Sequence, residues 1–538
     1  MFKRISILFI LLLALFLRSY HLNTLPPALF SDEVDAGYQA LVFNQNHTDY
    51  YGNKFPIHFH SFSDYRTSLY IYSVSFFQTI TNNSELAVRL PSVVFSVGSI
   101  YLFYLLTGSS LAAFLLAINP WSIHYGRTGF EVSGMLMVIL TGLYFWQKYL
   151  HQKQWGYLLL SGFFFCLSPY FYSTAKLFLP FIILAIFIIW HQAVFKIGLP
   201  KIIFTFLFCS FLLLPMLIDT VQGKAGFRFS YIGIFTEPHR EQITDNLRYQ
   251  DARTDHPGEI GIATSLISKV FHNKYQLIGE RFITNYVSAF SSEFLFLTGD
   301  NNQRHGFGGY GLLYLTDAIF IIIGLFSTKK KIAVLFMALL FLSPIPASLT
   351  RDSLGPHATR LILMLPSFIY FTYLGIHRFS RHHWLIGAII IFYCLQCFTF
   401  WHYYYYHYSQ NSALVWHTGM KEAVLATKDI SYQNIIFSDS AEPFLPFFLF
   451  YFSYRLPANH SLTSHLISVS NSSFSGQSLD NQYYFGRLNW SDLKSLPDHT
   501  IIVVPKSEYE SLKLSSPIIK KIAKKYINQE EFYILNFP

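Results

Sequence analysis

The sequence predicts a mainly α-helical, multi-pass membrane protein that ends in a smaller α/β domain. Hydrophobic residues make up 52% of the 538 residues, and charged residues make up only 13%, which is roughly half the charged share of a soluble domain. Apolar runs long enough to cross a bilayer recur along the chain. After residue 402 the pattern changes to short buried strands that alternate with polar turns, which is typical of an α/β domain.

About eleven apolar segments are predicted to span a bilayer, since a spanning helix needs about 20 mostly apolar residues. They cover roughly residues 3–19, 87–106, 108–123, 131–149, 156–174, 177–195, 201–218, 310–327, 331–349, 360–377 and 383–401. The first segment follows a charged start, as in a signal peptide. Arg18 and Tyr20 stand where such a peptide would need small residues for cleavage, so we expect this segment to be retained.

Short basic loops predict the orientation. With a cytoplasmic N-terminus, nearly every short inner loop carries Lys or Arg, as the positive-inside rule requires; these residues are Lys3, Arg4, Lys148, Lys153, Lys196, Lys201, Lys329, Lys330, Lys331, Arg378 and Arg381. The net charge of +9 is therefore largely a topology signal and does not favour nucleic-acid binding. The apolar segment 68–80 is short, and a span there would invert this pattern, so we expect an interfacial helix.

This topology divides the chain into a membrane domain over residues 1–402 and an extracytoplasmic α/β domain over residues 403–538. The membrane domain has two long outer loops, 20–86 and 219–309. In the C-terminal domain "QNIIFSDS" and "HTIIVVPKSEYESL" indicate buried strands, and "ALVWHTGMKEAVLATKD" indicates an amphipathic helix. The four cysteines lie in apolar runs, which predicts buried or lipid-facing thiols without disulfides. We expect the protein in a plasma membrane.

Unusual polar residues gather on the predicted outer side. The motif "LPPALFSDEVDAGYQA" carries Asp32, Glu33 and Asp35, and of these Asp35 is expected to be solvated. Further outer segments add Asp64, Arg66, His124, Arg127, Lys176, Arg351, His357 and Arg360. Carboxylates on one wall and cations on another suit an anionic substrate such as a phosphate, because Arg offers a matching fork of donors.

Each of these residues also has a simpler interpretation. Outer acids are often just solvated, Lys176 could extend its ammonium to the interface, Arg127 could anchor a lipid headgroup, and His124 could be an ordinary interfacial histidine. The functional interpretation is favoured because several unrelated short loops present their charges on one side.

Six motifs carry a family resemblance over about residues 20 to 370: "LPPALFSDEVDAGYQA", "DYRTSLYIY", "AVRLPSVVFS", "NPWSIHYGRTGFEVS", "LSPYFYSTAK" and "PIPASLTRDSLGPHATR". They resemble the polytopic GT-C glycosyltransferases, the superfamily of protein O-mannosyltransferases and lipid A aminoarabinose transferases. The resemblance is closest to the bacterial dolichyl-phosphate-mannose-transferase-like members. It implies a GT-C-like fold and transfer of a hexose or pentose from a polyprenyl-phosphate donor to a protein, lipid or glycan on the outer face.

The resemblance also implies residue roles. Asp32 would be the general base for an acceptor hydroxyl, or would orient it, with Glu33 in support and Asp64 as a second acidic position. Cations would offset the charge on the leaving phosphate; they are Arg66, Arg127, Lys176, Arg351 and Arg360. The aminoarabinose transferases tend to read E-K-P where this chain reads "DYRTS", which weakens the assignment of Asp64.

Other interpretations stay open. No strong metal-ligand spacing occurs in the outer loops, so a divalent cation is compatible with the sequence but not implied by it. A transporter or flippase for lipid-linked sugars, or a ligase-like membrane enzyme, would share the spans and the cationic pocket, although transporters tend to place polar residues near the bilayer midplane. A receptor with an outer α/β domain would need neither Asp32 nor a lipid donor.

Overall fold

The computed structural model describes residues 2–62, 64–81, 83–223, 232–236, 239–258, 264–327, 330–351, 355–428, 430, 432–457, 460–493, 496, 499–512, 518–523 and 530–537. The chain forms two compact units. The helical unit comprises Met1–Leu11, Ser99–Ser122 and Met135–Cys397, and the sheet unit comprises Leu12–Gly98, Ile123–Gly134 and Phe398–Pro538. Each unit is described by itself.

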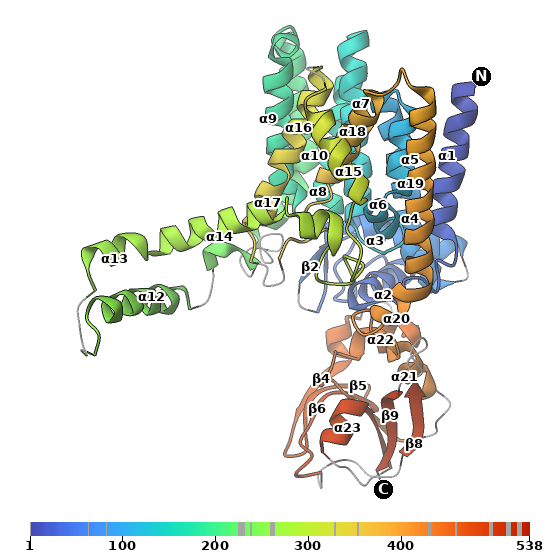
Figure 1. Ribbon diagram of the computed structural model, residues 1–538. Coiled ribbons are helices and arrows are strands. Elements are labelled where there is room, and N and C mark those ends of the chain that lie inside the picture. The colour runs from blue at the N-terminus through green and yellow to red at the C-terminus, as the bar shows by residue number, and fades with distance from the viewer. Residues whose placement is uncertain are drawn as a thin grey trace. The chain divides into compact units, whose positions relative to one another are not determined.

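Long apolar helices make up most of the helical unit (Figure 1). Five of the described helices have parts in both units: α1 (Phe2–Ser19), α4 (Ser84–Thr107), α6 (Pro120–Tyr125), α7 (Val132–Gln152) and α19 (His383–Tyr403). The remaining elements are α5 (Ser110–Ile118), α8 (Trp155–Phe171), α9 (Ala175–Val194), α10 (Leu199–Val221), η1 (Ile234–Thr236), α12 (Arg240–Asp255), α13 (Leu266–Phe271), α14 (Lys274–Ser288), η2 (Glu293–Leu297), α15 (Leu315–Leu325), α16 (Lys331–Leu342), α17 (Pro344–Ser348) and α18 (Met364–His377).

Helices α15 and α18 pack against each other through two glycines. A Cβ on Gly324 would overlap the backbone of Phe371, and a Cβ on Gly375 would overlap the backbone of Phe320. Small residues at such crossings let two helix backbones approach closely, which is the usual way for helices to associate in a membrane.

Five helices in the described residues are long and apolar enough to cross a membrane; they are Ser84–Thr107, Ala175–Val194, Leu199–Val221, Lys331–Ser348 and His383–Asn411. Shorter apolar helices cover Ser6–Ser19, Trp155–Phe171 and Leu315–Leu325. The chain is therefore a multi-pass membrane protein, but the count of about eleven spans is not confirmed. The predicted span 108–123 is broken, since α5 has only 9 residues and α6 follows it. The segment 68–80 forms α3 (Ser68–Ile80), whose 13 residues are too few to cross a bilayer.

The sheet unit combines the first outer loop with the C-terminal part of the chain. From the first loop come α2 (Ser31–Asn46), α3 and a hairpin of β1 (His58–His60) and β2 (Tyr65–Thr67). From the C-terminal part come η3 (Tyr404–Tyr408), α20 (Ser409–Asn411), α21 (Met420–Ala426), β3 (Asn434–Ser438), α22 (Leu445–Tyr451), η4 (Leu462–Ser464), β4 (Leu466–Ser470), β5 (Phe474–Leu479), β6 (Tyr483–Leu488), β7 (Thr500–Pro505), α23 (Lys506–Ser511), β8 (Ile518–Ala523) and β9 (Glu530–Phe537).

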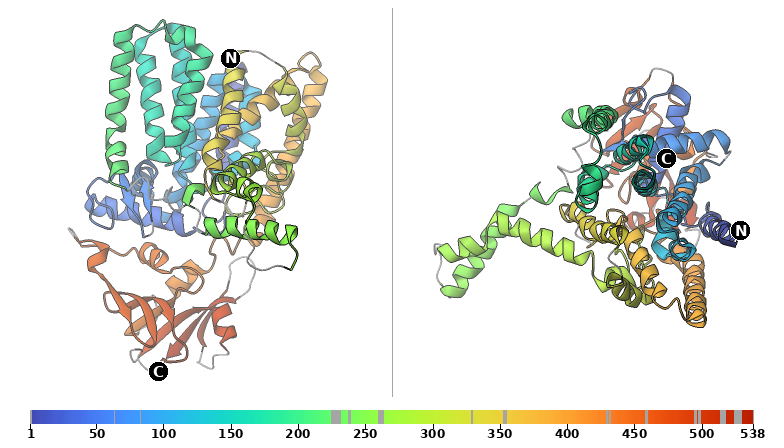
Figure 2. Two further views of the ribbon diagram at one scale, coloured as in Figure 1. Left: turned by 90° about the vertical axis from the view of Figure 1, so that its left-hand side faces the viewer. Right: turned by 90° about the horizontal axis from the view of Figure 1, so that it is seen from above.

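The C-terminal strands form one seven-stranded sheet of order β4-β5-β6-β3-β7-β9-β8, drawn in orange and red in Figure 2. The central strand β3 is parallel to both β6 and β7, and the outer pairs are antiparallel. This confirms the predicted strands in "QNIIFSDS" and "HTIIVVPKSEYESL". The predicted helix in "ALVWHTGMKEAVLATKD" is much shorter than expected, because Gly419 takes a φ of 98° and α21 begins only after it.

Helix α2 of the first outer loop packs against α22 of the C-terminal part within the sheet unit. A Cβ on Gly37 would overlap the ring of Phe450, so the glycine allows this close approach. The predicted division between residues 402 and 403 stays a prediction. The compact units differ from it, since the sheet unit also contains residues 12–98 and 123–134.

Candidate functional site: an acid-lined cavity in the sheet unit

The start of α2 fixes the three acids of the first outer loop. Asp32 and Glu33 lie in its first turn, where the positive end of the helix dipole favours carboxylates. Residues three apart share a helix face and adjacent residues do not. Asp32 and Asp35 therefore point to one side, and Glu33 points to another.

Arg66 on β2 forms ion pairs with the carboxylates of Asp32 and Asp35 on their shared side of α2. Its Nη2 lies 2.7 Å from Asp32 Oδ1, its Nε lies 2.5 Å from Asp35 Oδ2, and its Nη1 lies 3.8 Å from Glu131 Oε1. Burial opposes the charged form of Arg66, but Asp32 and Asp35 outweigh it and raise the pKa of this guanidinium. Arg66 was predicted to bind the donor phosphate; here it is occupied by carboxylates and orients Asp32.

Asp35 is buried, with 3% of its surface exposed, and the expectation that it is solvated is wrong. Its carboxylate accepts hydrogen bonds from Tyr50 Oη at 2.9 Å and Ser61 Oγ at 3.1 Å. Burial raises the pKa of Asp35, while the Arg66 charge acts in the opposite direction. No local pattern indicates this burial, because the groups that cover Asp35 come from residues 15 to 31 positions away.

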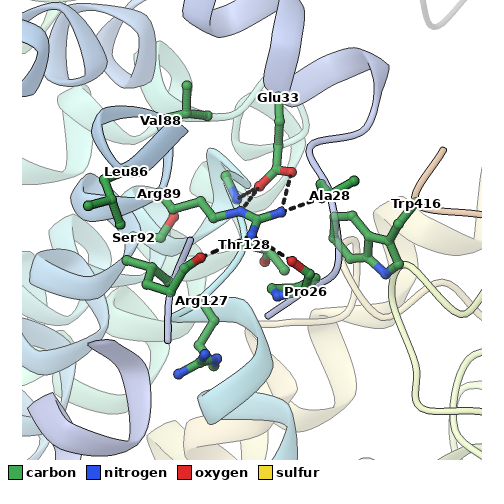
Figure 3. A network of polar contacts seen from close by, with 12 residues as sticks. Pro26, Ala28, Glu33, Leu86, Val88, Arg89, Ser92, Arg127, Thr128 and Trp416 are labelled. Carbon is green, nitrogen blue, oxygen red and sulfur yellow. Dashed lines mark hydrogen bonds and ion pairs between the residues drawn. The ribbon is translucent and has the colours of Figure 1, made fainter. Parts of the chain in front are cut away.

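Glu33 lies on the other side of α2, in the network of Figure 3. Both of its oxygens lie 2.9 Å from nitrogens of Arg89, and Glu33 Oε1 also accepts the Gly129 amide at 2.6 Å. Arg89 in turn donates to the carbonyls of Leu22, Pro26 and Ala28. The pair therefore fastens the first outer loop to α4 and lies outside the cavity lining. The catalytic support expected of Glu33 stays a prediction.

Arg127 and His124 also lie in packed surroundings. Arg127 donates to the carbonyls of Leu17, Tyr20 and Leu25 at 2.7 to 2.9 Å. His124 is fully buried, and its Nδ1 shares a hydrogen bond of 2.9 Å with Tyr404 Oη. These contacts tie the loop 123–134 to its neighbours. They give Arg127 a structural task, and the phosphate contact predicted for it stays a prediction.

A cavity of about 920 Å³ opens beside Asp32 and Asp35, within the roughly 300–1,000 Å³ common for ligand sites. All of its lining residues belong to the sheet unit. Its charged lining residues are Asp32, Asp35, Arg66, Asp439, Glu442 and Arg487. Carboxylates therefore outnumber guanidinium groups on its walls.

The C-terminal sheet forms the second wall of the cavity. Side chains on one face of a sheet alternate along each strand, and two cross-strand rungs line the cavity. One rung is Ser468, Gln477 and Phe485, and the other pairs Ser475 with Arg487. Hydroxyl, amide and aromatic groups of this kind suit a polar acceptor rich in hydrogen-bonding groups.

Asp439 is a cavity residue that sequence reasoning missed. It directly follows the parallel strand β3, and the outside of the carboxyl ends of parallel strands is where open α/β sheets bind ligands. Burial raises the pKa of Asp439 to about 7, although its carboxylate accepts the Phe444 amide and faces the charge of Arg487. The signal was present in "IIFSDS", as a buried strand followed at once by an acid.

Five further predicted residues also lie outside this cavity lining. Asp64 sits in the turn between β1 and β2 and accepts its neighbour's amide, Tyr65 N, at 2.7 Å. The other four, which are Lys176, Arg351, His357 and Arg360, belong to the helical unit. The Arg351 amide bonds to the Ile232 carbonyl at 2.6 Å, and Arg360 Nη1 donates to Thr350 Oγ1 at 2.6 Å.

His357 and Lys176 complete the predicted set, again in the helical unit. The His357 ring lies 4.3 Å from the ring of His305, and its Nδ1 lies 3.9 Å from Asp300 Oδ2. Lys176 at the start of α9 has a buried ammonium with no hydrogen-bond partner among the described residues. No group of three or more metal-binding side chains occurs in the part of the chain that the structure describes.

Helices that are long and apolar enough to cross a membrane define a multi-pass membrane protein. Its sheet unit holds an acid-lined cavity that is a candidate site for a polar ligand. A family model described as dolichyl-phosphate-mannose-protein mannosyltransferase matches residues 66–218. The predicted resemblance to the GT-C membrane glycosyltransferases is confirmed by this match. The matched range includes Arg66 and Lys176 and begins after Asp32.

Solved structures give more distant likenesses. The apo oligosaccharyltransferase of Archaeoglobus fulgidus is 15% identical with a TM-score of 0.42, and the match covers 79% of this chain and 58% of that one. This chain thus spans less than two thirds of that protein. ArnT from Cupriavidus metallidurans bound to undecaprenyl phosphate is 10% identical with a TM-score of 0.49, and the match covers 99% of this chain and 97% of that one. No curated protein matches the chain.

Proposed function

We propose that the protein is a membrane glycosyltransferase that moves a sugar from a polyprenyl-phosphate donor to an acceptor held in the cavity of the sheet unit. The observation that carries this proposal is the setting of Asp32. Its side chain is 48% exposed on the cavity wall, and Arg66 holds it in one orientation. The family match over residues 66–218 supports the same class of reaction.

In this proposal Asp32 is the general base. It accepts the proton of an acceptor hydroxyl while that oxygen attacks the anomeric carbon of the donor. The bond from the anomeric carbon to the phosphate oxygen breaks, and the lipid phosphate leaves with the electron pair. Arg66 fixes the direction of Asp32, which lowers the entropic cost of reaching the reactive geometry.

The charge on the leaving phosphate needs cations. Arg66 and Arg127 are engaged by carboxylates and carbonyls, respectively. In this proposal Lys176, Arg351 and Arg360, which the sequence also offers for this role, would stabilise the developing negative charge. A divalent cation at the phosphate stays a proposal beside them.

The site is assigned to the outer face of a plasma membrane, because the basic short loops favour a cytoplasmic N-terminus. The sugar is a hexose or pentose, and the acceptor is a protein, lipid or glycan. The polar sheet wall with Gln477 and Arg487 supports acceptor recognition by the C-terminal part of the chain.

The test is transfer of radiolabelled sugar from a panel of polyprenyl-phosphate sugars in membranes, with wild type, Asp32→Asn and Asp64→Asn. Asp64 is a matched control, since it is an acid of the same outer loop that lies outside the cavity lining. Transfer by wild type and Asp64→Asn, with loss in Asp32→Asn, would support the proposal. Equal transfer by Asp32→Asn would reject Asp32 as the base. Flipping of the lipid with no transfer from any donor would favour the alternative of a transporter or flippase.

A further inference from the structure

A second polar cavity, of about 710 Å³, lies in the helical unit. It forms where four apolar helices meet polar residues: α4 ends at Thr107, α15 is followed by Ser327, α16 begins at Lys331, and α18 ends at His377. Spanning helices pass from apolar to polar composition at the level of the lipid headgroups. The cavity therefore lies where a headgroup would be.

The lining of this cavity is cationic. Lys330, Arg378 and Arg381 line it together with His377, and no Asp or Glu is among its lining residues. The sequence itself contains no acid from 318 to 351 or from 353 to 421. Within the described residues, Arg378 and Arg381 form no ion pair, so their charges are available to an anion. Lys329 lies outside the described residues.

The same cavity has apolar and aromatic walls. Leu106, Ile332 and Leu374 supply apolar surface, and Tyr370 and Tyr373 lie with their ring centroids 6.2 Å apart. Tyrosines of this kind concentrate at membrane interfaces, where one end of the ring is apolar and the other is polar. A ligand that fits must therefore combine a negative group with an apolar part.

Basic loops alone do not produce such a site. Lys148 in the last turns of α7 and Lys153 directly after this helix place their ammonium groups 5.5 and 5.6 Å from the rings of Tyr144 and Tyr149, which satisfies those cations within the protein. Around Arg378 and Arg381 the positive charge instead surrounds an open volume. The positive-inside rule explains why these residues are basic but not why they line a cavity.

We propose that this cavity binds the headgroup of an anionic phospholipid, with the phosphate on Arg378 and Arg381 and the first acyl carbons on Leu374 and Ile332. Arginine presents several N–H donors in a plane that matches phosphate oxygens. Basic pockets between spanning helices are a recurrent way to hold anionic lipids, and the volume lies in the range common for ligand sites. This inference is independent of glycosyl transfer and of the acid-lined cavity.

The test measures lipid binding to the full chain in detergent by native mass spectrometry, with dioleoyl-phosphatidylglycerol as the probe and dioleoyl-phosphatidylcholine as the uncharged-headgroup reference. Arg378→Gln/Arg381→Gln is expected to weaken phosphatidylglycerol binding about 25-fold, at about fivefold for each cation removed. The matched control is Lys196→Gln/Lys201→Gln, which removes two exposed cations from the start of α10 and the turn before it. This control is expected to change binding much less, because neither lysine lines the cavity.

Two further variants keep the test decisive if the double Gln variant folds poorly. Arg378→Lys/Arg381→Lys keeps the charge but loses the planar donors, so it should bind more strongly than the double Gln variant and more weakly than wild type. Leu374→Trp fills the cavity from its apolar wall without changing the charge, and should weaken lipid binding. Equal losses in the cavity and control double variants would overturn the proposal, as would binding unaffected by Leu374→Trp. Competition by millimolar inorganic phosphate as effective as that by the lipid would show a free-anion site and would also overturn it.

Discussion

Arg89 donates two hydrogen bonds to Glu33: its Nε and Nη2 each lie 2.9 Å from a different carboxylate oxygen. Both side chains are almost completely buried, at 1% and 0% exposed. A buried ion pair is favourable only when its remaining hydrogen-bonding groups are satisfied. Here three backbone carbonyls accept the remaining hydrogen bonds of Arg89, and the Gly129 amide donates a further hydrogen bond to Glu33.

Removing the charge of only one partner of the Glu33–Arg89 pair should strongly destabilise the sheet unit. Glu33→Gln leaves the Arg89 charge buried without its counter-ion, and we expect a loss of about 3–5 kcal/mol in the free energy of unfolding. Thermal unfolding of the purified protein in detergent measures this. The double variant Glu33→Gln/Arg89→Met should recover part of the loss, because no buried charge is left unpaired.

An exposed ion pair provides the control for that experiment. Lys521 and Glu530 lie 2.9 Å apart with 53% and 34% of their side chains exposed, and exposed ion pairs of this kind contribute little to stability. Lys521→Gln should therefore shift the unfolding temperature little. If Glu33→Gln lowered the unfolding temperature no more than Lys521→Gln, the stabilising role of the Glu33–Arg89 pair would be contradicted.

Arg66 should affect turnover more than donor binding. Arg66→Gln releases Asp32 and Asp35 from a shared guanidinium, and a misplacement of about 1 Å can cost about 100-fold in rate. Arg66→Lys should not restore activity, since a single ammonium cannot match the geometry of the planar fork. Steady-state kinetics would show a fall in kcat with little change in KM for the donor. A rise in KM alone would instead indicate that Arg66 contacts the donor phosphate.

Asp439 should make stability depend on pH between about 4 and 7. Its pKa is raised from 3.8 to about 7 in the folded protein. As pH rises, the unfolded chain loses this proton before the folded protein does. The contribution of Asp439 to the free energy of unfolding is therefore fully present below about pH 4 and is lost towards pH 7. Asp439→Asn should flatten this slope in unfolding temperatures measured at several pH values. Glu510→Gln, which changes a 60% exposed acid, should leave the slope unchanged.

The contact between α2 and α22 should tolerate no side chain at Gly37. Gly37→Ala places a Cβ against Phe450 and Val88, and overpacking of this kind costs about 1–3 kcal/mol. Gly156→Ala is the matched control, because its Cβ would meet nothing within 4 Å. Thermal unfolding of the two variants measures the difference. Equal stability would mean that α2 and α22 separate easily.

Sequence patterns that extend over a few neighbouring residues predicted several features correctly. The apolar runs predicted a multi-pass protein, and "QNIIFSDS" and "HTIIVVPKSEYESL" predicted β3 and β7, because period and composition act over a few neighbouring residues. The helix expected in "ALVWHTGMKEAVLATKD" mostly failed, since a local turn at Gly419 overrode the apolar pattern. The number of spans was not settled by composition, because packing, kinks and loops decide where each helix ends.

The sequence by itself determined that the chain is a membrane protein, that acids follow its first apolar helix, and that a strand-rich domain ends it. Only the tertiary structure decided which of those acids share a cavity. Asp32 and Asp35 were separated from Glu33 by the helical period, but their partners Arg66 and Tyr50 come from distant turns. Asp439 reaches the same cavity from some 400 residues away, as a consequence of sheet topology and of the close packing at Gly37. Burial and charge pairing depend on these long-range contacts, and no local pattern encodes them.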